Sequence, residues 1–330
     1  MRLVVTGGAG YIGGFTARLL SQLGHEVVVV DDLSSGSPAN VGEAELLESD
    51  FASTEVRRLL AERQIEAILH FAGRKSVAES WRIPERYHET NVTKTRELLD
   101  AATAAGVKHL VYSSSCSVYG DVATNPVDES HRAAPMNPYA ESKWLGEQAI
   151  REAAEGGGPG FVILRYFNAA GADASHGERI DKAENLVPAA IRVALGFEPH
   201  LNIFGTDYPT ADGTAIRDYI HVDDLARAHA AAIDHLEVGG ASTTLNVGTG
   251  RGTSVRAIIE ELERASGRTI AVAEAARRPG DPVAMWADVT LAGRTLGWSS
   301  RQGIEEIIRS AWEWHSSSAG AEPGVTPVAD

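Results

Sequence analysis

The stretch VVTGGAGYIGG (residues 4–14) decides how this chain begins to fold, because three glycines separate an apolar run from a helical pattern. Gly7, Gly10 and Gly13 have the spacing G-x-x-G-x-x-G. Such a turn is tight, brings the backbone close to a pyrophosphate, and lets the next helix present free N–H groups to the anion. A glycine triplet alone also occurs in ordinary loops. The strand before it and the helix after it favour a dinucleotide-binding turn.

The second apolar run, EVVVVD (26–31), ends at Asp31, at the place where such folds carry an acidic residue. A carboxylate there accepts hydrogen bonds from the adenosine ribose and repels a 2′-phosphate, so NAD is favoured over NADP. A turn aspartate at a strand end is the alternative. Asp50 follows a third apolar stretch and could meet the adenine. Lys75 could pair with a phosphate or ribose oxygen, although a solvated lysine fits its spacing equally well.

Apolar runs with strand character alternate with helical stretches in the first half of the chain. The runs are 2–6, 26–31, 67–73, 109–115 and 161–168. Strands that alternate with helices form a parallel sheet covered on both faces. We therefore predict an α/β fold, with a Rossmann-type doubly wound parallel sheet.

The second half is polar and irregular, which predicts a smaller mixed α/β C-terminal domain for the substrate. The stretch TLNVGTG (244–250) reads as one more strand of the first sheet, so the two domains interleave. The last residues are small and polar with Pro and Gly, which predicts a disordered tail. The predicted units are an NAD-binding domain, a substrate domain and a tail: 1–168 with returns near 218–250, 169–315, and 316–330.

The composition is that of a globular protein, with 43% hydrophobic and 23% charged residues among 330. The net charge of −15 argues against a nucleic-acid surface but not against a small phosphorylated ligand. The single cysteine, Cys116, excludes an intrachain disulfide and fits a reducing compartment. The sequence shows neither a signal-peptide pattern nor the roughly 18 apolar residues of a membrane helix. We expect a soluble cytoplasmic protein without a membrane partner, a nucleic-acid partner or a metal.

NPYAESKWLGE (137–147) places Tyr139 four residues before Lys143, with Pro138 near the start of a predicted helix. Residues at i and i+4 share one helix face. A free tyrosine has a pKa of about 10, and lowering it to near neutrality requires about 4 kcal/mol of stabilisation of the phenolate. An ammonium group and the positive charge of oxidised nicotinamide both have the right sign.

The run HLVYSSS (109–115) ends in Ser113, Ser114 and Ser115, where ligands bind in open α/β sheets. Some of these hydroxyls can cap the strand end, and at least one can face a substrate. A serine, a tyrosine and a lysine after a nicotinamide-binding half form an apparatus that moves a hydroxyl proton while hydride passes to NAD. Their order matters most, because a Tyr–Lys pair alone is mostly chance.

With these motifs the chain resembles the nucleotide-sugar 4-epimerases of the extended short-chain dehydrogenase/reductase family, from Met1 to about His315. The matching segments are VTGGAGYIGG, HFAGRKSV, SSSCSVYG, NPYAESK, LRYFNAAG, IFGTDYPTADGTAIRDYIHVDDLA, NVGTG and RRPGDPVAMWAD. The block from Ile203 to Ala226 discriminates best, because the glycine and Tyr–Lys motifs belong to the whole superfamily.

The resemblance implies a role for each matching position. Tyr139 takes the proton of the sugar 4-hydroxyl, Ser115 assists, and Lys143 holds the nicotinamide ribose and lowers the pKa of Tyr139. Cofactor contacts fall on Gly7, Gly10, Tyr11, Ile12, Gly13, Asp31, Asp50, Phe51, Phe71, Ala72, Gly73, Lys75, Asn91, Tyr139, Lys143 and Phe167. UDP-sugar contacts fall on Ser115, Tyr139, Asn168, Asn185, Asn202, Ile203, Phe204, Arg217, Arg278, Asp281 and Met285. Arginines suit a diphosphate, although a surface ion pair is the alternative for Arg217 or Arg278 taken alone.

The implied reaction is NAD-dependent epimerisation of UDP-galactose and UDP-glucose at C4 through a transient 4-keto intermediate. One alternative is a UDP-N-acetylglucosamine 4-epimerase. Another is a different nucleotide-sugar-modifying relative, such as a dehydrogenase or decarboxylase that consumes NAD. A non-catalytic NAD-binding regulator on the same fold is a third. The related 4,6-dehydratases carry an Asp–Glu pair after the active-site serine or threonine, and Cys116 and Ser117 stand there instead.

Met285 occupies a position where many bacterial epimerases resembling this segment have a tyrosine that narrows the sugar pocket. Methionine is unbranched and adaptable, so it leaves open whether N-acetylated sugars are accepted. The resemblance also implies a homodimer through helices of the first domain, including the helix that bears Tyr139.

Overall fold

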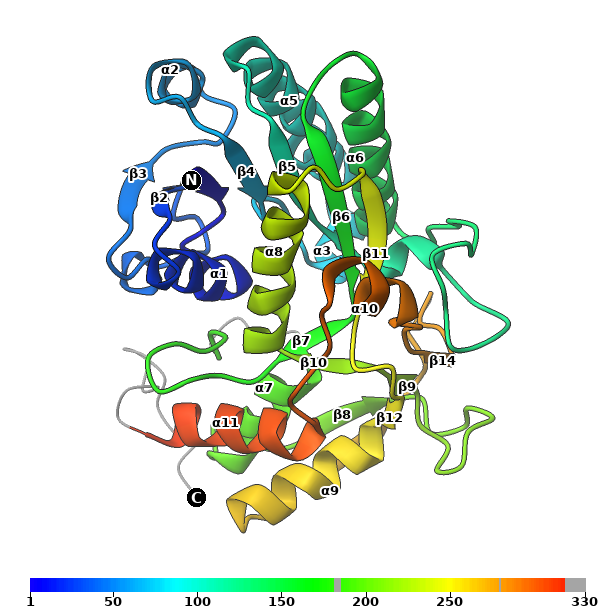
Figure 1. Cartoon of the computed structure of the whole chain (residues 1–330). Coiled ribbons are helices and arrows are strands. Elements are labelled where there is room, and N and C mark those ends of the chain that lie inside the picture. Colours follow the sequence, from blue (N-terminus) through cyan, green and yellow to red (C-terminus); the bar gives the residue numbers. More distant parts are fainter. Residues whose placement is uncertain (181–184, 279, 318–330) are drawn as a thin grey trace.

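The structure is a computed structural model that describes residues 1–180, 185–278 and 280–317 (Figure 1). Its strands are β1 (Arg2–Thr6), β2 (Glu26–Asp31), β3 (Glu45–Glu48), β4 (Ala67–His70), β5 (His109–Ser115), β6 (Gly160–Tyr166), β7 (Asn168–Ala170), β8 (Leu201–Phe204), β9 (Ile216–Arg217), β10 (Tyr219–His221), β11 (Thr243–Val247), β12 (Thr253–Ser254), β13 (Val272–Ala275) and β14 (Ala284–Met285). Its α-helices are α1 (Tyr11–Gln22), α2 (Thr54–Glu62), α3 (Val77–Arg82), α4 (Pro84–His88), α5 (Lys94–Ala105), α6 (Pro138–Glu155), α7 (Leu186–Ala194), α8 (Val222–Glu237), α9 (Val255–Ser266), α10 (Thr290–Leu296) and α11 (Ile304–Ser316). Short turns of other helix types cover Pro38–Asn40, Glu89–Thr93 and Cys116–Tyr119.

Seven strands form one parallel sheet in the order β11-β6-β5-β4-β1-β2-β3. Its central strands are buried on both faces, as the 0% exposure of Leu3, Val5 and Leu69 shows. This double burial explains why the sequence shows continuous apolar runs instead of alternation. The predicted Rossmann-type doubly wound sheet is confirmed.

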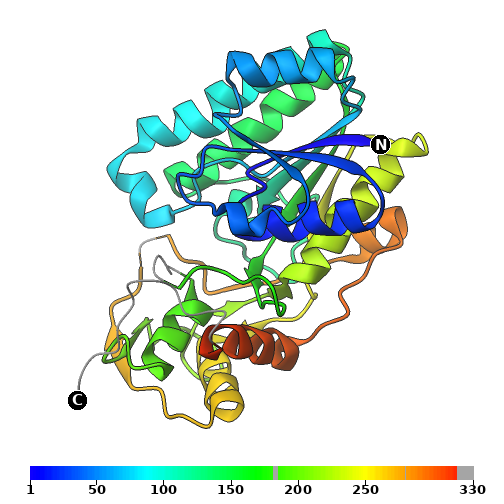
Figure 2. The ribbon, with the colours of Figure 1, turned by 90° about the vertical axis from the view of Figure 1, so that its left-hand side faces the viewer.

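Helices cover both faces of this sheet (Figures 1 and 2). On one face, α1 and α8 pack against strand residues such as Val29 and Leu164. On the other face, α2, α5 and α6 pack against residues such as Val28 and Ile163. Neighbouring strand residues therefore supply separate hydrophobic cores, because successive side chains point to opposite faces.

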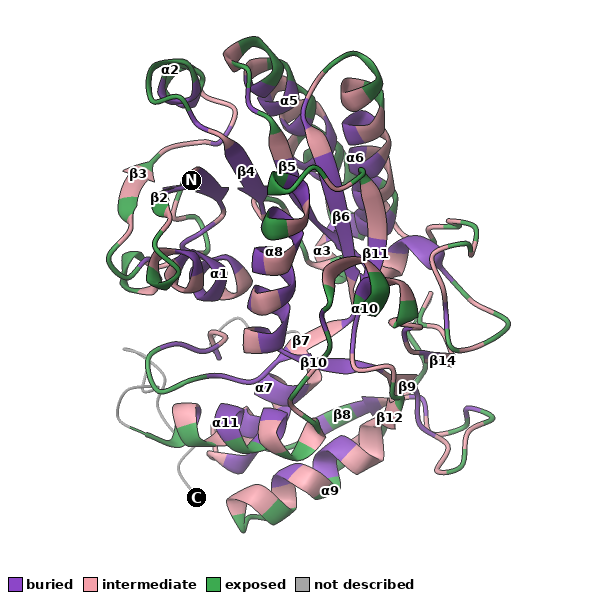
Figure 3. Ribbon diagram, in the orientation of Figure 1, coloured by how far each residue is buried: buried purple, intermediate pink, exposed green. Residues whose placement is uncertain are grey.

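A smaller lobe lies beyond the carboxyl ends of the sheet strands and contains α7, α9 and α11 (Figure 2). It carries short sheets of order β10-β7, β12-β9-β14 and β13-β8. Its own core includes Ile191, Ile258 and Ile307, each with 0% exposure. Figure 3 shows that each of these helices carries buried residues beside partly buried or exposed ones.

Three boundaries differ from the sequence prediction. The run expected at 67–73 ends at His70, because the N–H groups of Phe71 and Ala72 both bond to the Thr6 carbonyl and leave the regular ladder. The run expected at 161–168 divides in two: β6 stays in the large sheet, while β7 enters the lobe and pairs with β10. The expected strand near 244–250 is present as β11, at the edge of the large sheet.

The C-terminal tail prediction starts two residues too early, since α11 continues to Ser316 and residue 317 caps it. The rest of that tail, from residue 318, lies outside the described residues. Within the described ranges, the helices include none that is long and apolar enough to span a bilayer.

Candidate active site

The glycine turn between β1 and α1 leaves no room for side chains. Gly7 has a φ of 72°, in the left-handed region that favours glycine. A Cβ on Gly13 would lie 2.2 Å from the carbonyl oxygen of Gly7, so α1 approaches the turn only because this residue is glycine. Gly10 caps α1 without a side-chain hydrogen bond, which leaves the N–H groups of the first turn available to an anion. These features fit the pyrophosphate of a dinucleotide.

Asp31 lies at the carboxyl end of β2 and is 9% exposed. Its carboxylate accepts hydrogen bonds from the N–H groups of Ala9 (3.0 Å) and Leu33 (2.9 Å). Burial raises the pKa of Asp31, and these two hydrogen bonds counteract the rise in part. A carboxylate can accept about four hydrogen bonds, so Asp31 has capacity for ribose hydroxyls as well.

The loop after β4 lies beside the predicted catalytic helix. Asn91 is 1% exposed; its Oδ1 accepts from the N–H of Arg74 (2.8 Å), and its Nδ2 donates to Ser142 Oγ (2.9 Å). A Cβ on Gly73 would lie 2.8 Å from Asn91 Oδ1 and 3.8 Å from Lys143 Nζ. The backbone of this loop therefore runs close to Lys143, where a nicotinamide ribose is expected.

The other predicted cofactor residues differ in their burial and in their partners. Phe51 is buried with its ring 4.9 Å from that of His70, and Phe71 lies 4.5 Å from the ring of His229. Asp50 forms an ion pair with Lys94. The side chain of Lys75 is 71% exposed, and its Nζ lies 3.6 Å from a carboxylate oxygen of Glu178 in the lobe. Lys75 is thus both solvated and paired, and its contact with a cofactor stays a prediction.

The lobe closes on the glycine turn through residues 171–176. The hydroxyl of Tyr11 donates to the carbonyl of Gly171 (2.6 Å), and His176 Nε2 lies 3.0 Å from the carbonyl of Tyr11. Arg18 of α1 forms an ion pair with Asp173 at 2.8 Å. The N-terminus of α1, next to Ile12, is therefore held between sheet and lobe.

The helix α6 brings Tyr139 and Lys143 to the carboxyl end of β5. Asn137 caps the helix by accepting from the N–H of Ala140 (2.8 Å), with Pro138 in the first turn. Lys143 is 5% exposed, donates to the carbonyl of Ser113 (2.9 Å) and lies 4.9 Å above the ring of Tyr112. Serine, tyrosine and lysine thus meet at one place.

Burial dominates the pKa of Tyr139 in the chain without its cofactor. Burial raises it, and the hydrogen bond with Ser115 opposes that rise only in part. Burial also lowers the pKa of Lys143 to about 8, while the carboxylate of Glu147 raises it. The predicted effect of the Lys143 charge on the pKa of Tyr139 stays a prediction for the site with NAD bound.

Met285 and Phe167 belong to one buried apolar cluster. Met285 is 3% exposed and clusters with Val118, Tyr119 and Phe167. In the short sheet of the lobe, Met285 pairs with Arg217. A predicted sugar-pocket residue therefore touches a predicted cofactor residue and neighbours a predicted phosphate ligand.

The remaining predicted substrate residues spread over several elements of the lobe. Arg278 is exposed, with its guanidinium carbon 3.7 Å from the centroid of the Phe204 ring. Asn185 precedes α7 and donates to Glu178 (2.8 Å). Asn168 starts β7, Asn202 and Ile203 alternate between exposed and buried on β8, and Asp281 is exposed. The structure groups Arg278 with Phe204 and leaves Asn202 at the surface.

A model of the NAD dependent epimerase/dehydratase family matches residues 3–248. The chain belongs to this family. A UDP-glucose 4-epimerase of Rhizobium meliloti (strain 1021) is 43% identical over 317 residues, which cover 95% of this chain and 97% of that protein.

Solved structures of the family have the same fold. The UDP-glucose 4-epimerase of Stenotrophomonas maltophila, with bound NAD and formylated UDP-arabinopyranose, has a TM-score of 0.92 at 40% identity and covers 96% of this chain and 98% of that one. The UDP-Glc/GlcNAc 4-epimerase of Campylobacter jejuni has a TM-score of 0.84 at 35% identity and covers 96% of this chain and 99% of that one.

Sequence reasoning missed Asp218, a buried carboxylate next to the predicted phosphate ligand Arg217. It is 0% exposed and accepts from the N–H and hydroxyl of Thr249 (2.8 and 2.6 Å) and from the N–H groups of Gly250 (3.0 Å) and Ala287 (3.2 Å). It thereby fastens two loops to the strand that carries Arg217. In the sequence, Asp218 directly follows the predicted phosphate ligand Arg217, and this position could have identified it as a candidate.

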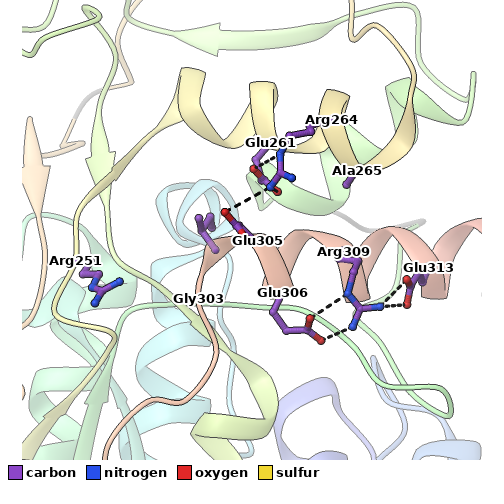
Figure 4. Close-up of a pocket in the computed structure, with 10 residues that line it drawn as sticks. Arg251, Glu261, Arg264, Ala265, Gly303, Glu305, Glu306, Arg309 and Glu313 are labelled. Atoms are coloured by element: carbon purple, nitrogen blue, oxygen red, sulfur yellow. Dashed lines mark hydrogen bonds and ion pairs between the residues drawn. The ribbon is translucent and has the colours of Figure 1, made fainter.

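A charged groove lies between α9 and α11 (Figure 4). Arg264 binds Glu261 there, and Arg309 binds Glu306 and Glu313. These arginines already have carboxylate partners, so the groove has the character of a solvated ion-pair surface. The buried group around Tyr139 is the better candidate for chemistry.

Proposed function

We propose that the protein is an NAD-dependent epimerase that interconverts UDP-galactose and UDP-glucose by inverting C4 through a transient 4-keto sugar. The observation that carries this proposal is the placement of two α6 residues at the carboxyl end of β5, where Lys143 donates to the Ser113 carbonyl and Tyr139 interacts with Ser115. The 4-epimerases with NAD and UDP-sugars among the relatives support it. Cys116 and Ser117 follow Ser115, so a dehydratase would lack its acid and base.

The NAD would be held by residues of the sheet half. The N–H groups after Gly10 would bind the pyrophosphate, and Asp31 would accept from the ribose. Lys143, held by the Ser113 carbonyl, would face the nicotinamide ribose beside Gly73. When bound, NAD supplies reversible hydride transfer and the positive charge of its oxidised ring.

Proton movement would be the work of the protein side chains. Tyr139 Oη would take the proton of the sugar 4-hydroxyl and later return it to the same oxygen, while Ser115 Oγ shares the proton path. In the chain alone, burial raises the pKa of Tyr139, so the phenol stays protonated until positive charge arrives. The base would therefore be activated only in the loaded site.

The UDP-sugar would be held mainly by the lobe. Arg217 and Arg278 are proposed as diphosphate ligands, because guanidinium groups bind phosphates in a forked geometry. The buried core around Met285 and Phe167 would border the sugar, which must turn over between the two half-reactions.

The division into domains and the assembly state are also proposals. Residues 1–168 with the later strand β11 would hold NAD, and 169–315 would hold the substrate. A cytoplasmic homodimer would form through α5 and α6, where Trp144 and Leu145 are only half-buried in the single chain. The lone cysteine Cys116 fits a reducing compartment.

The test is conversion without net redox change. Purified protein is incubated with UDP-galactose and NAD, and UDP-glucose is measured by chromatography while NADH is followed by absorbance. Many turnovers with no net NADH support epimerisation. Stoichiometric NADH would indicate a dehydrogenase instead, and absence of UDP-glucose would overturn the proposal.

A second activity, on UDP-N-acetylhexosamines, is favoured by Met285. Its flexible side chain is buried in the cluster that borders the proposed sugar site. The Campylobacter jejuni relative carries a UDP-Glc/GlcNAc name. Parallel assays with UDP-N-acetylgalactosamine would establish or exclude this activity.

A further inference from the structure

A fully buried ion pair lies on the same helix face as Tyr139 and Lys143. Glu147 is four residues after Lys143 on α6, so their side chains are neighbours. Glu147 is 0% exposed, and its two carboxylate oxygens accept from Arg165 Nε (2.9 Å) and Nη2 (2.6 Å) of β6. Arg165 is 4% exposed, and its guanidinium lies over the rings of Tyr119 (4.8 Å) and Trp144 (5.7 Å).

This pair also holds the end of β5, the strand that carries Ser115. Glu147 Oε1 accepts a hydrogen bond of 2.6 Å from Ser114 Oγ. Ser114 lies between Ser113, whose carbonyl accepts from Lys143 Nζ, and Ser115. One carboxylate therefore connects α6, β5 and β6 at the level of the proposed proton path.

Few other titratable groups face Lys143. His70 of β4 is neutral, because burial and the charge of Lys143 lower its pKa to about 3. Tyr112 of β5 lies under Nζ, and burial raises its pKa. Tyr87 of α4 contacts Tyr139 edge to face, and burial raises its pKa as well. Glu147 is thus the carboxylate that favours the charged form of Lys143.

We propose that Glu147 is a positioning residue, which uses its pair with Arg165 and its bond from Ser114 to hold Lys143 charged and in place for proton transfer at Tyr139. This role rests on the proposed function, in which Lys143 acts as an ammonium group. Burial lowers the pKa of Lys143 to about 8, and Glu147 opposes that effect. Lys143 loses its charge as the pH rises through its pKa, so activity must fall on the alkaline side. Removing the carboxylate moves this fall to lower pH.

The variants must separate charge from folding. Glu147→Gln removes the charge but leaves the Arg165 guanidinium buried without its partner, which destabilises the fold. The double variant Glu147→Gln, Arg165→Met removes both charges, and such replacements are often tolerated. Glu152→Gln is the matched control, because its carboxylate lies on the same helix in an exposed pair with Arg96.

The first readout needs no activity. The chain has five lysines, so carbon-13-labelled lysine allows the Lys143 resonance to be titrated by NMR in the protein as purified. We expect Lys143 to titrate at lower pH in the double variant than in wild type or Glu152→Gln. If conversion of UDP-galactose fails in wild type, the proposed function falls while this titration still tests the role of Glu147.

The second readout is the pH profile of kcat. We expect the double variant to stay within about twofold of wild type near pH 6.5 and to lose roughly tenfold at the alkaline end. One result would overturn the proposal: the double variant has the Tm of wild type, but neither the alkaline fall of its kcat nor the titration of Lys143 moves to lower pH. Failure of the double variant to fold would also overturn it, because the pair would then serve folding and not Lys143.

Discussion

The large sheet and the smaller lobe solve the same problem, placing side chains at a site, in different ways. The sheet half uses seven parallel strands whose carboxyl ends meet at one edge. The lobe uses sheets of two or three short strands, joined by loops whose shape depends on buried hubs such as Asp218. In the sheet half, many paired strand residues together set the position of each functional side chain. In the lobe, single residues with several hydrogen bonds set the shape of the loops. Changes in the first should abolish function, and changes in the second should tune it.

The largest effect is expected from Tyr139→Phe in the sheet half. Loss of the phenolic oxygen removes the proposed acid–base group, which should reduce kcat about a thousandfold. Conversion of UDP-galactose to UDP-glucose measures this, with Tm and bound NAD unchanged. The matched control is Tyr87→Phe, whose hydroxyl donates to the Ser76 carbonyl (2.6 Å) and Glu79 (2.9 Å) instead. Near-wild-type turnover of Tyr139→Phe would remove it from the mechanism.

Gly13→Ala should destabilise the sheet half, because the new side chain clashes with the backbone of the glycine turn. The new Cβ would meet the Gly7 carbonyl oxygen at 2.2 Å, so α1 must move away from the turn. We expect a loss of about 3 kcal/mol in the free energy of unfolding, together with loss of bound NAD. Calorimetry and NAD released on denaturation measure both. Gly303→Ala is the control, since its Cβ would meet nothing within 4 Å; equal effects of the two changes would refute the argument.

Asp218→Asn should weaken the lobe while leaving the sheet half intact. An amide cannot accept all four hydrogen bonds of this buried carboxylate, which should cost about 2 kcal/mol of stability. Because two loops beside Arg217 loosen, KM for the UDP-sugar should rise about tenfold, with bound NAD retained. Steady-state kinetics and NAD content decide this. Asp234→Asn, at an exposed position on α8, is the control. A fall in NAD content with unchanged KM would contradict the division between the two regions.

The smallest effect is expected from Met285→Tyr, which should alter selectivity alone. A rigid ring beside Phe167 leaves less space for an N-acetyl group, so the activity ratio of N-acetylated to plain UDP-hexose should fall about tenfold. Both activities are measured by chromatography. Met136→Tyr, at a residue that is 43% exposed, controls for the substitution itself. Unchanged ratios would rule Met285 out as the gate.

The sequence predicts the sheet half well because its signals are local. Val27 to Val30 read as one buried strand, and Gly7, Gly10 and Gly13 are tied to a turn by sterics alone. The position of Asp31 follows from where that strand ends. Such features need no knowledge of distant residues, so the parallel sheet and the cofactor turn could be anticipated.

Other features depend on contacts that no local pattern reveals. Glu147 binds Arg165 of a different element, and only folding shows that both are buried. The pKa of Tyr139 depends on its burial and on side chains of other elements, such as Tyr166 and Ser115. The run at 161–168 reads as a single strand, because nothing at Phe167 announces that the chain changes sheets there. Long-range burial and pairing therefore account for each missed feature.

The passage of the chain from β6 into the lobe and back to β11 limits how this protein can be divided. A fragment ending at residue 168 would lack β11, the strand that pairs with β6 along the sheet edge. It would also lack α8, which covers one face of β5 and β6. Such a fragment would expose an open edge strand and an apolar face, both of which promote aggregation. The sheet half and the lobe must therefore be expressed together, as one folding unit.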